Sequence, residues 1–118
     1  MTTRISGKDI YVDQYDFGVN VKFNIKNKDG TPYDLTGYEA QFIVKLKKDD
    51  DDTLAIESVI LSDFADNVIT VPIDKYLTEN PVGTYCYAIR LFKSGVFVDT
   101  IIQAKFNIAN NTFESGVE

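Results

Sequence analysis

The chain has 118 residues, of which 44% are hydrophobic and 25% are charged, and its formal net charge is −6. These values fit one soluble globular domain with its own core, and the negative charge argues against nucleic acid or an anionic membrane as partner. Histidine is absent, which removes the most common general base and zinc ligand, and the single cysteine, Cys86, excludes an internal disulfide.

The chain carries no sign of export. The N-terminus lacks the apolar segment of a secretion signal, and no apolar run approaches the roughly 18 residues of a membrane helix. We therefore expect the protein to be made and to fold in a reducing cytoplasm. We expect one domain over residues 1–118, with its core at about 8–108, a loose or edge-pairing arm at 1–7, and a polar tail or linker at 109–118.

The first half of the chain contains two strong strand patterns. Apolar and polar residues alternate over residues 18–26 and again over 38–47, which is typical of strands with one buried face. The predicted inward residues are Val19, Val21, Phe23 and Ile25 in the first strand, and Ala40, Phe42, Val44 and Leu46 in the second. A shorter alternation at Ile10 and Val12 predicts an edge strand, and residues 27–32 have the composition of a tight turn.

The middle of the chain is less regular. Residues 49–52 are four aspartates and predict a solvated loop, whereas residues 53–61 are apolar without a clear period. We interpret 53–61 as a strand, although a bulge or a short helix would give the same pattern. Residues 68–73 predict another strand, in which Pro72 indicates an edge position or a strand end. Asp74 then predicts the N-cap of a single helical turn.

Residues 80–108 predict a hairpin of two long strands joined by a tight turn at residues 93–95. On its period-two pattern Cys86 points outward. The side chain of Tyr85 is placed to bond back to the backbone near Tyr76 or Leu77, as a corner tyrosine does. The predicted inward residues are Tyr85, Tyr87, Ile89 and Leu91 on the first strand, and Val96, Val98, Ile102, Ala104, Phe106 and Ile108 on the second.

About seven short strands, turn signals every 8–12 residues and almost no helix predict an all-β fold. The expected architecture is an immunoglobulin-like antiparallel β-sandwich, and a small barrel is the alternative.

The sequence contains no motif for catalysis or for binding a cofactor. Calcium prefers several oxygen ligands, which makes residues 49–52 a candidate, but they lack the glycine and the closing glutamate of an EF-hand loop. Cys86 has no histidine to activate it, so a small structural residue is favoured. No two carboxylates are marked as a glycosidase pair. We expect no catalytic residue, no metal site, no cofactor and no enzymatic activity.

A partner-binding surface is expected on the outer face of one sheet. In an immunoglobulin-like fold, the strand at 38–47 shares a sheet with both strands of the hairpin. The outward apolar residues of these strands are Ile43, Ala88, Phe92, Phe97 and Ile101. The strand at 18–26 turns only asparagine and lysine outward, so the asymmetry predicts one contact face. The alternatives are scattered exposed apolar residues or an error in strand parity.

Two passages carry a family resemblance. Residues 29–38 read DGTPYDLTGY and lead into an alternating strand, while residues 83–85 read GTY and open a strand that is followed by VDT at 98–100 and FNI at 106–108. Over about residues 8–108 the chain resembles the N-terminal immunoglobulin-like domain of baseplate upper proteins from tailed phages of Gram-positive bacteria.

The resemblance implies a structural role. In that family the domain anchors to the baseplate, and a following stalk carries the receptor-binding proteins. Because the sequence ends at Glu118, we expect a stand-alone structural protein or an isolated domain. The expected location is the virion after folding in a bacterial cytoplasm, and the expected partners are other tail or baseplate proteins or a second copy. The alternative is a carbohydrate-binding or cell-wall-binding β-sandwich, which the absence of tryptophan disfavours.

Overall fold

A computed structural model describes residues 4–6, 8–16 and 18–110, which form an all-β fold and so confirm that prediction. The strands are β1 (Arg4–Ser6), β2 (Asp9–Asp13), β3 (Val19–Asn24), β4 (Tyr38–Lys45), β5 (Glu57–Leu61), β6 (Val68–Ile73), β7 (Gly83–Lys93) and β8 (Val96–Ala109). Two short helices interrupt them: the 3-10 turn η1 (Asp52–Leu54) and α1 (Lys75–Thr78). The tail predicted at 109–118 lies, from residue 111 on, outside the described residues.

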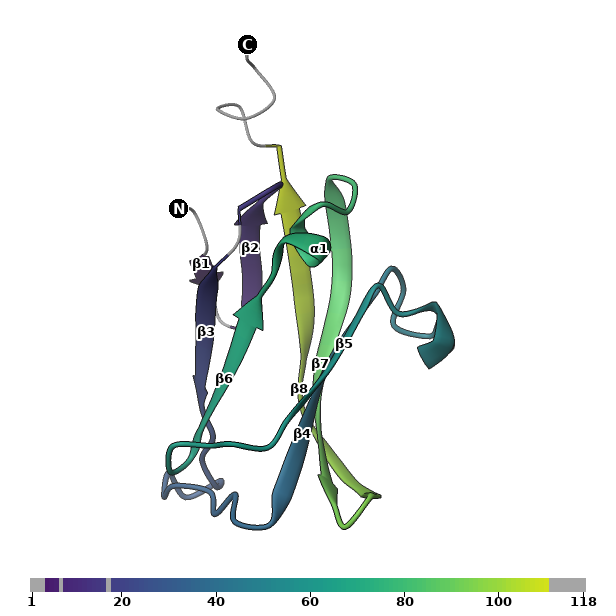
Figure 1. Cartoon of the computed structure of the whole chain (residues 1–118). Coiled ribbons are helices and arrows are strands. Elements are labelled where there is room, and N and C mark those ends of the chain that lie inside the picture. The colour runs from purple at the N-terminus through teal and green to yellow at the C-terminus, as the bar shows by residue number, and fades with distance from the viewer. Residues whose placement is uncertain (1–3, 7, 17, 111–118) are drawn as a thin grey trace.

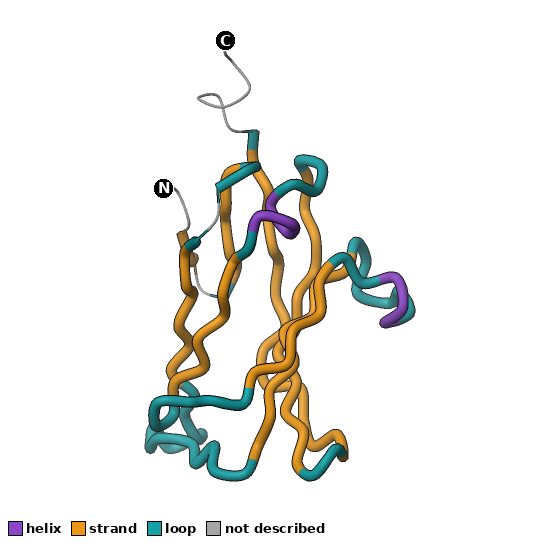
Figure 2. The backbone as a smooth tube through the Cα atoms, in the orientation of Figure 1, coloured by secondary structure: helices purple, strands orange, loops and turns teal. Residues whose placement is uncertain are grey.

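The strands form two sheets that face each other (Figures 1 and 2). One has six strands in the order β1-β2-β8-β7-β4-β5, and the other consists of β3 and β6. The β2 strand pairs parallel to β8, with Ile10 opposite Phe106, so the prediction of a purely antiparallel fold is wrong at this pairing. The strand at Ile10 and Val12 is not at the edge either, because β1 pairs with its other side.

The core lies between the two sheets. Four aromatic rings connect the layers: Phe23 on β3 lies 6.2 Å from Tyr87, which lies 5.6 Å from Phe42, which in turn lies 6.4 Å from Phe106. Aliphatic side chains from both sheets surround these rings, as the alternating patterns predict. Leu46 is an exception: β4 ends at Lys45, and Leu46 is 56% exposed rather than inward.

The β6–α1 segment follows the local signals in the sequence. Pro72 lies on β6 of the two-stranded sheet, where an edge is open and a missing N–H is tolerated. Asp74 is the N-cap of α1, and its Oδ1 accepts a hydrogen bond of 2.9 Å from the Leu77 N–H. Both predictions are confirmed.

The hairpin turns at two residues with positive φ, Ser94 at 52° and Gly95 at 78°, which suit the twist of a two-residue hairpin loop. The pairing then slips twice. Ile89 lies opposite Ile102, but its neighbour Arg90 lies opposite Thr100, and the second slip falls between Leu91 and Phe92. Each slip inserts an extra residue into β8 as a β-bulge.

Two valines that were predicted to be inward are exposed. Val96 is 65% exposed and Val98 is 44% exposed. Val98 is the extra residue of the second bulge and has no partner on β7, so the regular period of two fails there. The two extra residues together restore the period at Val96, which is exposed because it lies at the hairpin tip opposite the exposed Lys93.

Tyr85 is a corner tyrosine, although its partner differs from the prediction. Its ring is buried, and its hydroxyl donates a 2.6 Å hydrogen bond to the Pro81 carbonyl rather than to the backbone near Tyr76 or Leu77. Burial also raises the pKa of this hydroxyl. The bond fixes the entry into β7, because it ties the strand to the residue two positions before it begins.

Removing this hydroxyl tests the corner. We expect Tyr85→Phe to lower the free energy of unfolding by about 1 kcal/mol, the net value of one hydrogen bond, while the ring stays packed. The free energy of unfolding is measured by urea denaturation. Tyr76→Phe is the matched control because Tyr76 is 75% exposed. Equal stability of the Tyr85 variant and the parent would show that the corner bond contributes nothing.

Candidate partner-binding surface

The outer face of the six-stranded sheet carries the residues predicted to bind a partner. Ile43 and Ala88 are direct cross-strand neighbours on β4 and β7, and Phe92 and Phe97 are neighbours on β7 and β8. These four share the outer face, as predicted. They do not form one exposed stripe, because Ile43 is only 2% exposed whereas Phe97 is 52% exposed.

Phe92 and Phe97 remain accessible near the tip of the hairpin. Their ring centroids lie 5.8 Å apart with an angle of 73° between the ring planes, an edge-to-face contact. Val96 and Val98, on either side of Phe97 in β8, are also exposed at this tip, and Val96, which lies opposite Lys93, points to the other face of the hairpin. We call Phe92, Val96, Phe97 and Val98 the tip patch. Exposed apolar side chains that gather in this way are typical of contact surfaces.

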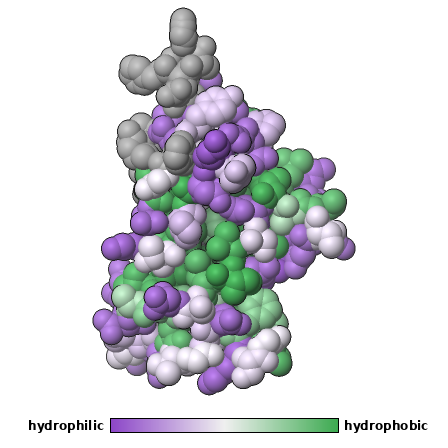
Figure 3. All heavy atoms as spheres, in the orientation of Figure 1, coloured by the Kyte–Doolittle hydropathy of each residue, from purple (hydrophilic) through white to green (hydrophobic). Residues whose placement is uncertain are grey.

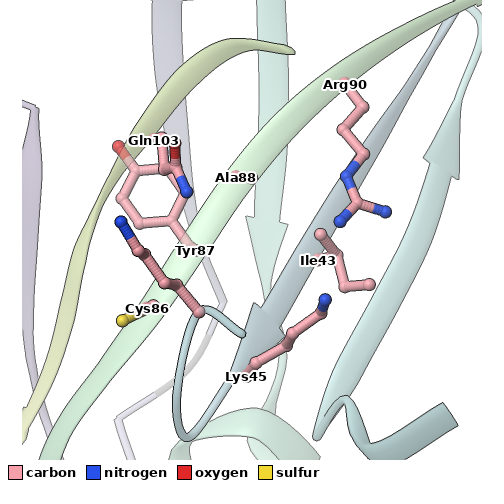
Figure 4. A pocket seen from close by; sticks show the side chains of 8 residues that line it. Ile43, Lys45, Cys86, Tyr87, Ala88, Arg90 and Gln103 are labelled. Carbon is pink, nitrogen blue, oxygen red and sulfur yellow. The ribbon is translucent and has the colours of Figure 1, made fainter. Parts of the chain in front are cut away.

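Ile43 lies under the loop between β4 and β5. This loop includes η1, projects beside the sheet in Figure 1, and is held to the outer face by charged groups. Figure 4 shows Ile43 between the side chains of Lys45 and Arg90. With Ala88 these residues line a hollow of about 30 Å³, which has room for about one water molecule and not for an organic ligand.

Asp52 is the centre of the contact between loop and sheet. Its carboxylate accepts two hydrogen bonds from the Arg90 guanidinium, at 2.7 and 3.2 Å, and lies 2.6 Å from Lys45 Nζ. Lys45 also donates a 2.8 Å bond to the Asp50 carbonyl. We call Lys45, Asp52 and Arg90 the clamp. Its geometry is the bidentate one that makes an arginine–carboxylate pair strong.

The four aspartates at 49–52 do not act as one acidic cluster, because the clamp and the local turns engage three of them separately. The hydrogen bonds from Arg90 and then from Lys45 lower the pKa of Asp52 to about 2. Asp51 accepts from the Thr53 N–H as the N-cap of η1, and Asp50 accepts from the Lys47 N–H. The carboxylates are therefore directed at different partners and do not converge, and the described part of the chain contains no cluster of three potential metal ligands.

Ile101 does not belong to the surface that was predicted. It lies at the first slip of β8, is half-buried, and packs against the core cluster. The bulge rotates its side chain away from the position that simple alternation assigns. A lysine at this position would disturb the core as well as any partner contact, so it is unsuitable for testing an interface.

Cys86 lies on the outer face between two lysines, with Lys45 opposite on β4 and Lys105 opposite on β8. Its thiol is free and half-buried, and it borders the hollow of Figure 4. The outward orientation confirms that Cys86 is not directed into the core.

The two aromatic pairs nearest the surface of the described residues are not flat platforms for a sugar. The rings of Tyr33 and Tyr38 are tilted by 58° and those of Phe92 and Phe97 by 73°. Tyr76 stands on α1, whose neighbouring Lys75 lies over its ring. Sugar binding through stacking would need coplanar exposed rings.

Sequence reasoning missed three features. The clamp joins Asp52 to a residue 38 positions away, and no local pattern reports it. The exposure of Val96 and Val98 is the second, because Val96 lies at the hairpin tip and Val98 is the extra residue of a bulge. Glu57 is the third: its carboxyl is partly buried on the inward side of β5, and only its position opposite the buried Val44 identifies it.

The fold and this surface define a class: a two-layer β-domain with an aromatic core, a clamped loop and an exposed apolar hairpin tip. A family model described as the BppU N-terminal domain matches residues 2–118. The chain therefore belongs to the family of baseplate upper protein N-terminal domains, which confirms the resemblance and extends it over nearly the whole chain. A search of the curated proteins gave no significant match.

The family is that of a structural domain of the phage baseplate, an assembly of virion proteins. Over residues 4–6, 8–16 and 18–110 there is no helix of the length and hydrophobicity needed to cross a membrane.

Proposed function

We propose that this chain is a structural module of a phage or prophage tail or baseplate, and that it acts by contacts with other virion proteins or with a second copy of itself. The main support for this proposal is the match of the family model to residues 2–118. On this proposal the protein is not an enzyme and binds neither nucleic acid nor membrane, in keeping with its net charge of −6.

We further propose that residues 1–118 form one immunoglobulin-like domain. The support is the strand order β8-β7-β4-β5, which matches the order G-F-C-C′ of variable-type immunoglobulin sheets. The pair of β3 and β6 then corresponds to strands B and E. The bond from Tyr85 to Pro81 lies at the entry to the strand equivalent to F, where the tyrosine corner of such domains is found.

The partner contact is assigned to the tip patch. Phe97 is half-exposed and lies edge-to-face on Phe92, and such aromatic side chains contribute strongly to binding when a partner covers them. Ile43 is buried and Ala88 is half-buried, so neither offers a partner as much exposed area as Phe97 does. We therefore expect one variant at the hairpin tip to separate binding from folding.

The test is incorporation of Phe97→Lys into particles. We expect the parent chain in purified virions, and we expect Phe97→Lys to lower its amount at least about tenfold, the effect of losing roughly 1.4 kcal/mol of contact energy. The thermal unfolding midpoint should stay close to that of the parent, because the position is exposed. Quantitative mass spectrometry of purified particles measures the amount of the chain.

Val82→Lys is the matched control, because Val82 is 51% exposed, almost as much as Phe97 at 52%, and lies at the opposite end of β7. It should enter particles like the parent. Equal incorporation of Phe97→Lys and the parent would remove the tip patch from the interface. Absence of the parent chain from particles would overturn the structural role itself.

A further inference from the structure

The carboxyl of Glu57 occupies an unusual position for an acidic group. Glu57 begins β5, the outermost strand of the large sheet, and pairs with the fully buried Val44, so its side chain points between the two sheets. Its Oε2 is buried and has no hydrogen-bond partner among the described residues. A buried oxygen without a partner costs on the order of 1–3 kcal/mol if the group is ionised, and this cost calls for an explanation.

Asp74 supplies the explanation from the other sheet. It follows β6 and caps α1, where its Oδ1 accepts the Leu77 N–H and its second oxygen is left for another donor. Burial is the main reason why the pKa of Glu57 is raised to about 7, and a hydrogen bond to Asp74 and the negative charge of Asp74 raise it further. Two carboxyls can share a hydrogen bond only while one of them is protonated.

The described lysines on the neighbouring β4 strand and on α1 are directed elsewhere. Lys45, next to Val44 on β4, points to the opposite face of the sheet and belongs to the clamp. On α1, Lys75 and Tyr76 are exposed and contact each other. The inward Tyr87 on β7 donates its hydroxyl to the Lys8 carbonyl. One interaction works in the opposite direction: a hydrogen bond from the backbone of Ser58 favours the ionised form of Glu57 and so lowers its pKa.

The pair lies on the open side of the molecule. The β5 and β6 strands belong to different sheets and do not pair with each other, and Figure 3 shows apolar surface in the middle of this side. Half-buried apolar residues of the β5 region, Ile56, Leu61 and Phe64, pack there against the core. A polar bond between Glu57 and Asp74 therefore connects the two sheets where no backbone hydrogen bonds do so.

We propose that Glu57 and Asp74 share one proton and form a latch that holds the edge strand β5 to α1, and that loss of this proton loosens β5 from the small sheet. The latch is closed at mildly acidic pH and opens as the pH rises, because the protonated form of Glu57 is stabilised by folding. Its contribution to stability is complete below the ordinary pKa of 4.5 and is lost as the pH rises through about 7.

The proton itself is directly measurable. With ¹³C-labelled glutamate, the carboxyl resonance of Glu57 should titrate more than one pH unit above the ordinary glutamate pKa of 4.5. Asp74→Asn, which keeps an N-cap side chain, should lower the Glu57 midpoint because the negative charge is removed. A Glu57 midpoint at the ordinary value of 4.5, or a midpoint unaffected by Asp74→Asn, would overturn the proposal.

The movement of β5 is tested by amide hydrogen exchange. From pH 6 to pH 8.5 the protection factors of residues 57–61, corrected for intrinsic exchange, should fall by about tenfold or more in the parent, which corresponds to one pKa unit of differential stabilisation. Glu57→Gln keeps a donor for Asp74 without a titrating proton, so its protection should not change with pH. Glu39→Gln on the neighbouring β4 is the control and should behave like the parent. Identical pH profiles for Glu57→Gln and the parent would exclude the latch.

Discussion

Phe42→Ala should lower the free energy of unfolding by about 3–5 kcal/mol, a large part of the stability of a domain of this size. Phe42 is completely buried and contacts both Tyr87 and Phe106 in the core. The substitution removes a ring at the centre of the four that connect the two sheets, and the rings around it belong to strands that are fixed by backbone pairing. The cavity can therefore collapse only in part, which places the cost high in the usual range.

Urea denaturation followed by circular dichroism measures this loss. Phe97→Ala is the matched control because it removes the same ring from an exposed position, and we expect a change of no more than about 0.5 kcal/mol. A loss below about 1 kcal/mol for Phe42→Ala would show that the core does not depend on the aromatic cluster. A comparable loss for Phe97→Ala would show that the tip patch is packed within the folded domain and is not free for a partner.

Asp52→Ala should release the loop between β4 and β5 and lower the free energy of unfolding by about 1–2 kcal/mol. Surface ion pairs are usually worth less, but this carboxylate holds a bidentate Arg90 and a Lys45 side chain that is only 9% exposed. Without Asp52, the Lys45 ammonium keeps only the Asp50 carbonyl as a partner, and that carbonyl belongs to the released loop. Amide exchange of residues 47–56 should become faster, and Ile43 should become accessible.

The pH dependence of this effect has a definite sign. The folded protein holds the pKa of Asp52 at about 2, below its ordinary value of 3.8, so the contribution of the clamp is present above about pH 4 and is lost as the pH falls through 2. The stability difference between the parent and Asp52→Ala should therefore shrink in acid. Asp49→Ala, with the same charge change at an exposed position of the same loop, is the control. A difference that stays constant from pH 5 to pH 2 would contradict the clamp.

The clamp and the tip patch divide the outer face into two parts. The loop covers Ile43 and so removes the middle of the sheet from contact, whereas Phe97 remains available at the hairpin end. Opening the clamp would enlarge the apolar surface next to Ala88. Comparing particle incorporation of Asp52→Ala with that of Phe97→Lys would therefore tell whether the covered part contributes to assembly.

The elements that depend on near neighbours followed from the sequence. The alternation at 18–26 and 38–47 became β3 and β4, Asp74 caps α1, and the turn between the long strands lies at Ser94 and Gly95. Each of these elements depends on residues within a few positions of one another. The strands depend on alternating side chains, the cap on a side chain bonded to an N–H three residues later, and the turn on two neighbouring residues with positive φ. Local signals of this kind are present in the order of the residues.

The elements that depend on residues far apart in the chain could not be predicted from the sequence. The parallel pairing of β2 with β8 joins residues almost a hundred positions apart, and alternation within β2 gives no strand direction. The bulges depend on how two backbones align, so the sequence alone does not show that Val98 is the extra residue of a bulge and is exposed. The strand expected over 53–61 is shorter and begins at Glu57, because Asp52–Leu54 forms the turn that the clamp holds.

The sequence by itself determined the all-β class, the family and the face to which Ile43, Ala88, Phe92 and Phe97 point, because the side chains of a regularly paired strand alternate whatever surrounds the sheet. Tertiary structure decided which of these residues are exposed. Ile43 lies under a loop that is held by charges far apart in the chain, and a bulge places Ile101 against the core. Exposure depends on what packs over a side chain, and only the folded chain brings those covering groups together.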